Sequence, residues 1–411
     1  MLNIYSVLAP IALILFVMEL SYCLYKKNDF YSFHDSFTNL STGIGNQLVN
    51  LLVMGFVFSF YQPLYEMTPL KMDYSFINML ILLVLVDFIF YWIHRFGHSI
   101  NFLWAAHSPH HSGEEMNLAL AMRASVTMRL TSFFFFWPLA FLGFSPQMIY
   151  AASGIQLIIA FWHHTKLIGN MGWFEKYFNT PSHHRVHHGT NEKYLDKNFG
   201  EIFIIWDKMF GTFQKEEEEV NFGILRQPKS LNPLVINFHF WSLLFSDFKE
   251  TNSLWDKVRI WFMPLGWRPK DIKTFRSAVK PLNKNEYDRY SPTSFLGAKP
   301  LLIIQLIFCL YIMFLALDMT SSLSLNGRIL CGVYIWASMM SWGAILESRS
   351  WGLKLSFGKE ILLSLILISF NTNLGFYNYS VSILLLLCLI SFLGSVFIYQ
   401  RNRFSLTQYD A

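Results

Sequence analysis

The chain has 411 residues, of which 53% are hydrophobic, 18% are aromatic and only 14% are charged. A soluble globular chain carries roughly 25% charged residues, so this composition excludes an ordinary soluble protein and indicates an integral membrane protein. The formal net charge is +5, but no basic stripe with interleaved aromatic residues accompanies it, so nucleic acid is not expected as a partner.

Taken in chain order, several apolar stretches approach the roughly 20 residues that a helix needs to cross a membrane. Such spans are expected near 4–25, 40–61, 75–94, 124–143, 145–164, 299–318, 328–346, 357–373 and 380–399. The fourth and fifth are punctuated by Pro138, Gly143 and Pro146, which suit a tight helical hairpin that dips into the membrane and returns. The sequence therefore predicts an all-α fold, a polytopic membrane helix bundle of about nine spans.

The distribution of Lys and Arg predicts the orientation of this bundle. Lys26 and Lys27 follow the first span, Arg401 and Arg403 follow the last, and the long segment 165–298 is rich in both residue types. Nine spans with the N-terminus outside place all these groups in the cytoplasm. The location expected is a bacterial inner membrane or the endoplasmic reticulum.

Eleven of the 13 histidines fall in three clusters, and only His34 and His239 stand apart. His94 and His98 are spaced i, i+4, so that on a helix both rings lie on one face. The pair His163–His164 closes the fifth span. Two HxxHH sets complete the clusters, at His107, His110 and His111 and at His184, His187 and His188. An even number of predicted crossings separates the first and last clusters, so both face the cytoplasm.

Clustered imidazoles favour iron, copper, zinc or nickel as a bound metal. Packing does not explain two HxxHH sets, because each buried ring has two nitrogens to satisfy. Nine nitrogens exceed the roughly four that one zinc ion binds, and they leave positions for a bridging oxygen or O2 around two six-coordinate ions. We therefore predict two metals, with the ligands His94, His98, His107, His110, His111, His164, His184, His187 and His188.

Two other kinds of membrane protein stay open at this point. A metal transporter usually binds its ion near the bilayer midplane on broken helices, whereas these histidines gather at helix ends and in a loop. A haem cytochrome needs axial histidines paired across spans, for which HxxHH sets are superfluous.

The histidine segments resemble those of the membrane-bound fatty acid hydroxylase/sterol desaturase superfamily, and among its members the alkylglycerol monooxygenases. The resemblance is specific across roughly 85–215 and is carried by "YWIHRFGH", "LWAAHSPHHSGEEMNLALAMR", "FWHHT", "NTPSHHRVHHGTN" and "DKNFGEIFIIWDKMFGTF". It implies a helical membrane bundle with a cytosolic, histidine-rich di-iron site. It also implies division into N-terminal spans (1–74), a catalytic domain (75–215), a cytoplasmic connector (216–298) and a C-terminal transmembrane bundle (299–411).

The resemblance implies O2-dependent hydroxylation of the carbon next to the ether oxygen of a glyceryl ether, with tetrahydrobiopterin as reductant. The resulting hemiacetal falls apart to a fatty aldehyde and glycerol. Hydroxylation or desaturation of a sterol, fatty acyl or sphingoid chain is the alternative, because the fold supports many chemistries. The expected partners are a membrane lipid, O2 and an electron donor, which is a reduced pterin or a redox protein. No residues are assigned to cofactor binding.

The chain departs from the family pattern at three positions. Ser99 stands where a Glu is expected after the second histidine of the first cluster. His163 is an extra imidazole, which makes His164 the expected ligand, and His183 precedes the second HxxHH set.

Three further polar residues are predicted to support catalysis from beside the metals. Asp87 lies seven residues before His94 within an apolar span, where a carboxylate is costly, and is expected to orient a ligating histidine from another helix. Asp196 and Asn198 in "DKNFG" are candidates for the same role. Glu19 in the first span has no predicted role.

Overall fold

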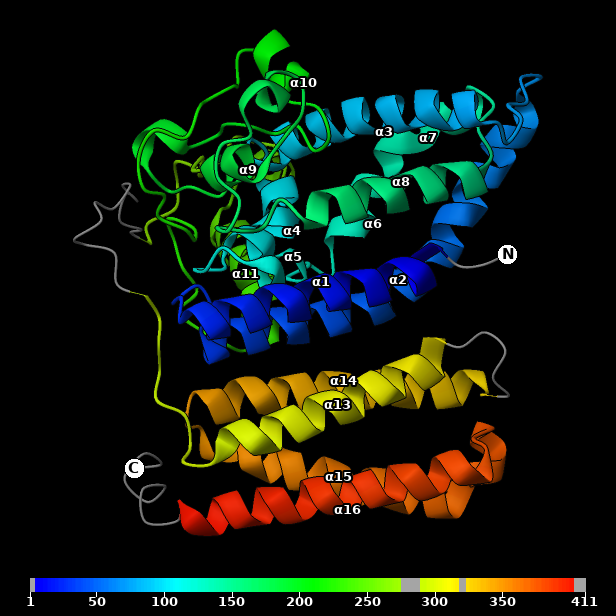
Figure 1. Cartoon of the computed structure of the whole chain (residues 1–411), viewed down its shortest axis with the longest axis vertical. Helices are drawn as coiled ribbons and strands as arrows, with labels where there is room; N and C mark the ends of the chain where they lie inside the picture. Colours follow the sequence, from blue (N-terminus) through cyan, green and yellow to red (C-terminus); the bar gives the residue numbers. More distant parts are fainter. Residues whose placement is uncertain (1–3, 275–288, 318–322, 403–411) are drawn as a thin grey trace. The chain divides into compact units, whose positions relative to one another are not determined.

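The computed structural model describes residues 4–274, 289–317 and 323–402, and its regular elements over these ranges are all helical (Figure 1). The predicted all-α fold class is confirmed. The helices of ten or more residues are α1 (Ile4–Lys26), α2 (Phe33–Met67), α3 (Phe76–Gly97), α4 (Asn101–His111), α8 (Pro146–Phe161), α11 (Pro233–Glu250), α13 (Ala298–Leu317), α14 (Leu325–Leu346), α15 (Ser350–Leu374) and α16 (Asn378–Arg401). The shorter ones are α5 (Leu118–Ala121), α6 (Met128–Ser132), η1 (Phe133–Phe136), α7 (Trp137–Phe141), η2 (Gly172–Lys176), α9 (Pro181–His187), η3 (Glu192–Tyr194), α10 (Ile205–Met209) and α12 (Leu254–Arg259).

Within the described residues, four helices are long and apolar enough to cross a membrane: α3, α13, α14 and α16. They coincide with the spans predicted at 75–94, 299–318, 328–346 and 380–399, and the protein is a membrane protein. Helices α1, α2 and α15 cover the spans predicted at 4–25, 40–61 and 357–373. The total of nine crossings stays a prediction. Arg403, residue 318 and residues 275–288 of the predicted connector lie outside the described residues.

The expected span at 124–143 is not one helix but the short helices α6, η1 and α7 in succession. Pro138 lies in the first turn of α7, where a missing backbone N–H is tolerated. The Tyr61 hydroxyl donates to the carbonyl oxygen of Phe133, which ties this broken segment to α2. Gly143 then turns the chain into α8 with φ +93°, and a Cβ there would lie 2.6 Å from the carbonyl oxygen of Leu70. Side-chain and backbone contacts to α2 and to the 68–72 loop therefore override the apolar pattern.

The chain forms two compact units, the first comprising residues 1–39, 52–228 and 237–289. Its apolar core joins α2, α3, α7 and α8, with Leu82, Val86 and Met148 almost fully buried. Ser75 and Ser145 cap the N-termini of α3 and α8 by accepting from Asn78 N (3.3 Å) and Met148 N (3.3 Å). All clustered histidines belong to this unit.

The second unit comprises residues 40–51, 229–236 and 290–411, and its helices α13 to α16 pack against one another. Buried polar groups link these helices: Gln305 Nε2 on α13 donates to Ser356 on α15 (2.7 Å) and Ser391 on α16 (2.8 Å), and the Tyr334 hydroxyl on α14 donates to Glu360 on α15 (2.8 Å). Such interhelical bonds stabilise helix association where both helix surfaces and lipid are apolar. The division of the chain into four parts stays a prediction.

Candidate metal centre

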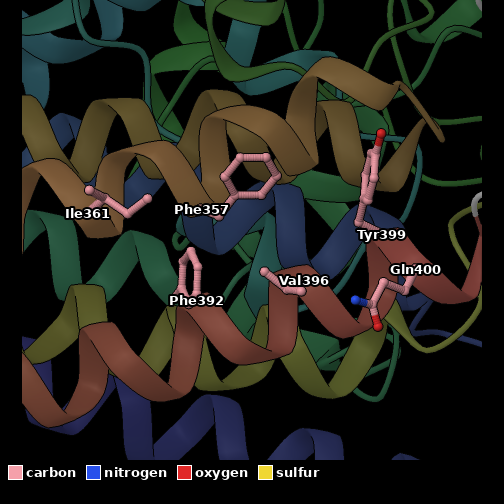
Figure 2. Close-up of a pocket in the computed structure, with 6 residues that line it drawn as sticks. All are labelled: Phe357, Ile361, Phe392, Val396, Tyr399 and Gln400. Carbon is pink, nitrogen blue, oxygen red and sulfur yellow. The ribbon is translucent and has the colours of Figure 1, made fainter.

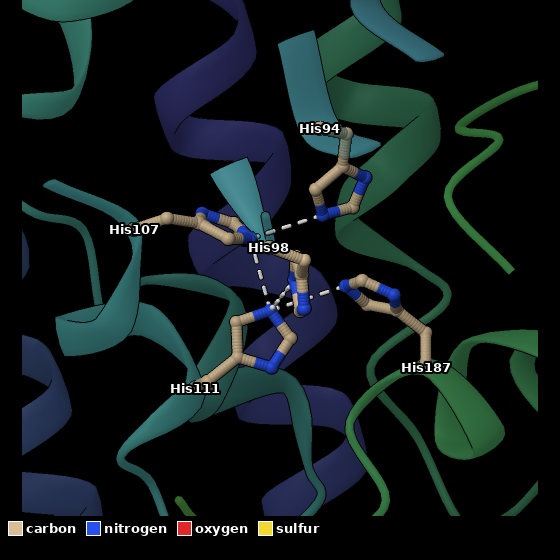
Figure 3. A group of neighbouring side chains, drawn as sticks. All are labelled: His94, His98, His107, His111 and His187. Atoms are coloured by element: carbon tan, nitrogen blue, oxygen red, sulfur yellow. Dashed lines mark hydrogen bonds between the residues drawn. The ribbon is translucent and has the colours of Figure 1, made fainter. Parts of the chain in front are cut away.

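The structure gathers the nine predicted histidines in two groups, and every member is buried except the half-buried His110. Within each group one nitrogen of every ring lies within 4.8 Å of the others. The five-histidine group consists of His94, His98, His107, His111 and His187 (Figure 3). The four-histidine group consists of His110, His164, His184 and His188. The two groups adjoin, because the rings of His111 and His188 stack with their centroids 4.3 Å apart.

Each HxxHH set supplies both groups. On α4, His107 and His111 are one helical turn apart and join the five-histidine group, while His110 joins the other group. On α9 the roles are exchanged: the pair His184 and His188 joins the four-histidine group, and His187 joins the five-histidine group. An i, i+4 pair shares one helix face and the residue between them projects to the side, so one turn of helix can serve two adjacent sites.

The ring nitrogens that meet within each group are all Nε2. In the five-histidine group, His107 Nε2 lies 3.0 Å from His94 Nε2 and 2.9 Å from His111 Nε2. In the four-histidine group, His184 Nε2 lies 2.9 Å from His164 Nε2 and 3.1 Å from His188 Nε2. Metal–imidazole bonds about 2.1 Å long place neighbouring nitrogens about 3.0 Å apart in octahedral and about 3.4 Å apart in tetrahedral geometry. These four separations lie nearer the octahedral value, whereas the 3.3 Å between His164 Nε2 and His110 Nε2 lies nearer the tetrahedral value.

Backbone carbonyls fix the tautomer of four rings. Their Nδ1 atoms lie near a carbonyl oxygen, which only accepts, so Nδ1 carries the proton and Nε2 presents a lone pair. The pairs are His94 with Phe199 (2.8 Å), His187 with Lys197 (3.0 Å), His110 with Arg123 (3.0 Å) and His164 with Ala160 (3.2 Å).

Burial disfavours the protonated form of the six rings in the two HxxHH sets. It lowers the pKa of His110 to about 4. It lowers the pKa of the other five rings well below the ordinary value of 6.5: His107, His111, His184, His187 and His188. Neutral rings with lone pairs facing one another at about 3 Å repel unless a cation lies between them. Both groups therefore have the donor set of a buried transition-metal site.

The segment 196–199 supports the five-histidine group with three oxygen atoms. Lys197 and Phe199 supply the carbonyls described above, and Asp196 Oδ1 lies 3.6 Å from His98 Nδ1. Asp196 and Asn198 have φ of +57° and +54°, in the left-handed region that Asp and Asn tolerate better than most residues. Asn198 holds the bend by donating to the carbonyls of His183 (3.1 Å) and Gln214 (2.7 Å). Asp196 thus lies beside a candidate ligand, whereas Asn198 shapes the backbone.

In the part of the chain that the structure describes, the Asp87 carboxylate forms its hydrogen bonds with groups other than histidines, and the orienting role expected for it stays a prediction. Its Oδ1 accepts from Gln156 Nε2 (3.0 Å) and Ile202 N (2.8 Å), and its Oδ2 accepts from Phe203 N (3.1 Å) and Trp206 Nε1 (2.9 Å). These four donors occupy the carboxylate fully. Asp87 therefore anchors the 202–206 segment and α8 to α3, and its effect on the metal centre is indirect.

Asp207 is a supporting residue that the sequence interpretation missed. Its buried carboxylate accepts from Phe199 N, Gly200 N and Thr212 Oγ1, each at 2.7 Å, and burial raises its pKa. Because Phe199 also presents its carbonyl to His94, Asp207 fixes the peptide that orients a candidate ligand. The available signal was its position in "DKNFGEIFIIWD", eight residues after Phe199, which does not by itself reveal a loop folding back.

The remaining polar residues near the clusters lie outside both groups. His183 Nε2 lies 3.9 Å from Glu175 Oε2, and the His163 ring packs on Trp162 with centroids 4.8 Å apart. Ser99 donates to the carbonyl of Arg95 at 2.8 Å and is exposed. The expectation that His164 rather than His163 joins the ligand set agrees with this geometry.

A separate cavity of about 510 Å³ opens between α15 and α16 in the second unit (Figure 2). It is lined by Phe357, Ile361, Phe392, Val396, Tyr399 and Gln400. This lining contains no histidine, cysteine or carboxylate, so the cavity is not a metal site.

Comparisons with known proteins agree with the histidine pattern. The Fatty acid hydroxylase family model matches residues 79–212, which contain all nine histidines. The alkylglycerol monooxygenase of Homo sapiens is 36% identical over 265 residues, which cover 64% of this chain and 59% of that protein. Those of Danio rerio and Xenopus tropicalis are each 33% identical, over 81% and 77% of this chain and 75% and 71% of their own lengths. No solved structure matches the chain.

Proposed function

The chain belongs to the fatty acid hydroxylase family, and we propose that it is a membrane-bound di-iron monooxygenase that cleaves the ether bond of alkylglycerols. Family membership makes it an O2-dependent oxidoreductase acting on a lipid. The observation that carries the proposal is the pair of buried histidine groups whose Nε2 lone pairs converge within the region that the family model matches.

Two iron ions would be held by the two groups, one by the five-histidine group and one by the four-histidine group. Iron supplies the binding and reduction of O2 that attack on an unactivated C–H bond requires. The protein's own backbone carbonyls fix the tautomers of His94, His110, His164 and His187, and burial limits the access of water to the Nε2 atoms.

The substrate assignment rests on the relatives, which are alkylglycerol monooxygenases. One oxygen atom of O2 enters the C–H bond next to the ether oxygen. The other leaves as water, with two electrons and two protons from the reductant. The hemiacetal then breaks to a fatty aldehyde and glycerol. The reductant is a diffusing reduced pterin, with tetrahydrobiopterin the candidate that the resemblance supplies.

The metal centre faces the cytoplasm, in a bacterial inner membrane or the endoplasmic reticulum. Lys26 and Lys27 at the end of α1 and Arg401 at the end of α16 support this orientation. All four cysteines are buried, so an introduced thiol at exposed Glu192 tests it with little background. Labelling of Glu192→Cys from the cytoplasmic side supports the orientation, and labelling from outside alone contradicts it.

The activity test supplies purified protein with iron, O2, a reduced pterin and a labelled 1-O-alkylglycerol. Fatty aldehyde is the expected product, and a variant with His184→Ala and His188→Ala is the inactive control. Hydroxylated lipid formed only with a ferredoxin or cytochrome b5 system would reassign the protein to hydroxylation of a sterol, fatty acyl or sphingoid chain. Iron uptake into proteoliposomes without any oxidised lipid would reassign it to metal transport.

A further inference from the structure

Glu19 places a carboxylate inside α1, an otherwise apolar helix, where an unpaired carboxylate would be costly. Its side chain is 7% exposed, and three donors converge on it. Tyr31 Oη and Leu118 N donate to Oε2, the latter at 2.8 Å, and Thr165 Oγ1 donates to Oε1. The Glu19 carboxylate therefore joins α1 to the segments that contain Tyr31, Leu118 and Thr165. The activity proposed above assigns no role to it.

Two of these donors belong to segments that carry or contact ligands of the four-histidine group. Thr165 directly follows His164, and its N–H donates to the carbonyl of His163 at 2.9 Å. Leu118 is the first residue of α5, the short helix that leads to Arg123, whose carbonyl lies 3.0 Å from His110 Nδ1. Glu19 therefore fixes the backbone beside two of the four ligands.

Thr165 also connects Glu19 to the segment that carries the other two ligands, His184 and His188. Its carbonyl accepts from Arg185 Nη1 at 2.9 Å, and Arg185 lies on α9 between His184 and His188. All four members of the four-histidine group are thus connected to Glu19 through Thr165 or α5. In the five-histidine group, the carbonyls of Lys197 and Phe199 hold His187 and His94 instead, and neither of these residues hydrogen-bonds to Glu19 in the described structure.

We propose that Glu19 is a positioning residue for the four-histidine group and sets the metal affinity of that group selectively. The proposal rests on the proposed function in one respect, that each histidine group holds an iron ion. Helix α1 packs against α5 and α8, which makes its carboxylate the tie between the first helix and the metal centre.

Three variants test this role. Glu19→Gln keeps the size of the side chain but removes the negative charge and turns one of the two acceptor atoms into a donor, which weakens the hold on the three donors. Thr165→Val removes the hydroxyl that donates to Glu19 and that also accepts from Leu167 N at 3.0 Å. The control is Glu360→Gln, which removes a buried carboxylate from the second unit, where it accepts from Tyr334 at 2.8 Å.

The measurement is iron content per chain and Fe(II) affinity of the purified full-length protein, with helical content by circular dichroism alongside. Loss of a group that orients a metal ligand typically lowers metal affinity by about 10- to 100-fold. We expect that loss for one of two irons in Glu19→Gln, a smaller loss in Thr165→Val and none in Glu360→Gln. Glu19→Gln combined with His184→Ala and His188→Ala should bind the same single iron as the histidine variant alone.

The outcomes separate this proposal from the function on which it rests. Wild-type protein that binds fewer than two irons contradicts the two-metal function and removes the basis for any selective effect. Two irons in the wild type with unchanged affinity in Glu19→Gln and Thr165→Val overturn the role of Glu19 alone. Equal weakening of both irons in Glu19→Gln with full helical content also overturns it, because the effect would then not be confined to one group.

Discussion

Replacing Asp207 by Asn tests whether the loop after α9 orients the five-histidine group. The wild-type carboxylate accepts from three buried donors, Phe199 N, Gly200 N and Thr212 Oγ1, each at 2.7 Å. Asp207 Oδ1 accepts from Phe199 N and Thr212 Oγ1, and Oδ2 accepts from Gly200 N alone. The amide of Asn keeps one oxygen, so the least disruptive rotamer leaves the Gly200 N–H facing a donor.

One buried donor without a partner costs about 1–3 kcal/mol, so we expect a destabilisation of that order in Asp207→Asn. Because the Phe199 peptide also presents its carbonyl to His94 Nδ1 at 2.8 Å, its displacement disturbs one ligand of the five-histidine group. We expect the Fe(II) affinity of that group to fall by about 10- to 100-fold, as when other groups that orient metal ligands are removed.

The assay is Fe(II) titration of the metal-free protein together with its thermal midpoint. Asp247→Asn is the matched control, because Asp247 is buried and bonds Arg268 at 2.7 and 2.9 Å in the same unit. The control should lose stability without losing iron affinity. If Asp207→Asn lowers the thermal midpoint as the control does but binds iron like the wild type, the orienting role of Asp207 is refuted.

Other predictions concern neighbouring groups. His163→Ala should keep both irons whereas His164→Ala should weaken one, which iron analysis of the two purified variants checks. Burial, reinforced by a neighbouring carboxylate, raises the pKa of Glu201 from 4.5 to about 8. The folded state therefore binds this proton more tightly than the unfolded state, and the free energy of unfolding falls as the pH rises from about 4.5 to about 8. Glu201→Gln should flatten this dependence in thermal melts between these pH values, and an unchanged slope would contradict it. Arg185 bonds Glu216 through Nε (2.7 Å) and Nη2 (2.6 Å), and Arg185→Lys cannot form this fork, so it should lower the iron content of the four-histidine group. Full iron content in that variant would refute this prediction.

That these nine histidines lie together was predictable from the sequence, because the HxxHH and HxxxH spacings are local. An i, i+4 pair on a helix shares a face whatever surrounds it. The assignment of His110 and His187 to opposite groups was not predictable, since it depends on how α4 and α9 approach each other. The family resemblance drawn from the same motifs is confirmed.

The supporting residues were harder to predict, because their partners are distant in the chain or are backbone atoms. Asp87 looked like a ligand-orienting carboxylate, yet its donors come from residues 69 to 119 positions away. Asp207 acts through the Phe199 peptide, which no side-chain pattern marks. The broken 124–143 segment is largely apolar although it contains Arg129, and the tertiary contact of Tyr61 with Phe133 and the turn at Gly143 distinguish it from a span.

The central claim is that each histidine group binds its own iron. Iron content per chain in three purified proteins tests it most directly: the wild type, a variant with His94→Ala and His98→Ala, and a variant with His184→Ala and His188→Ala. Each variant removes two ligands from one group and leaves the other group intact. The account predicts two irons in the wild type and one in each variant. One iron in the wild type, lost completely in both variants, would contradict it.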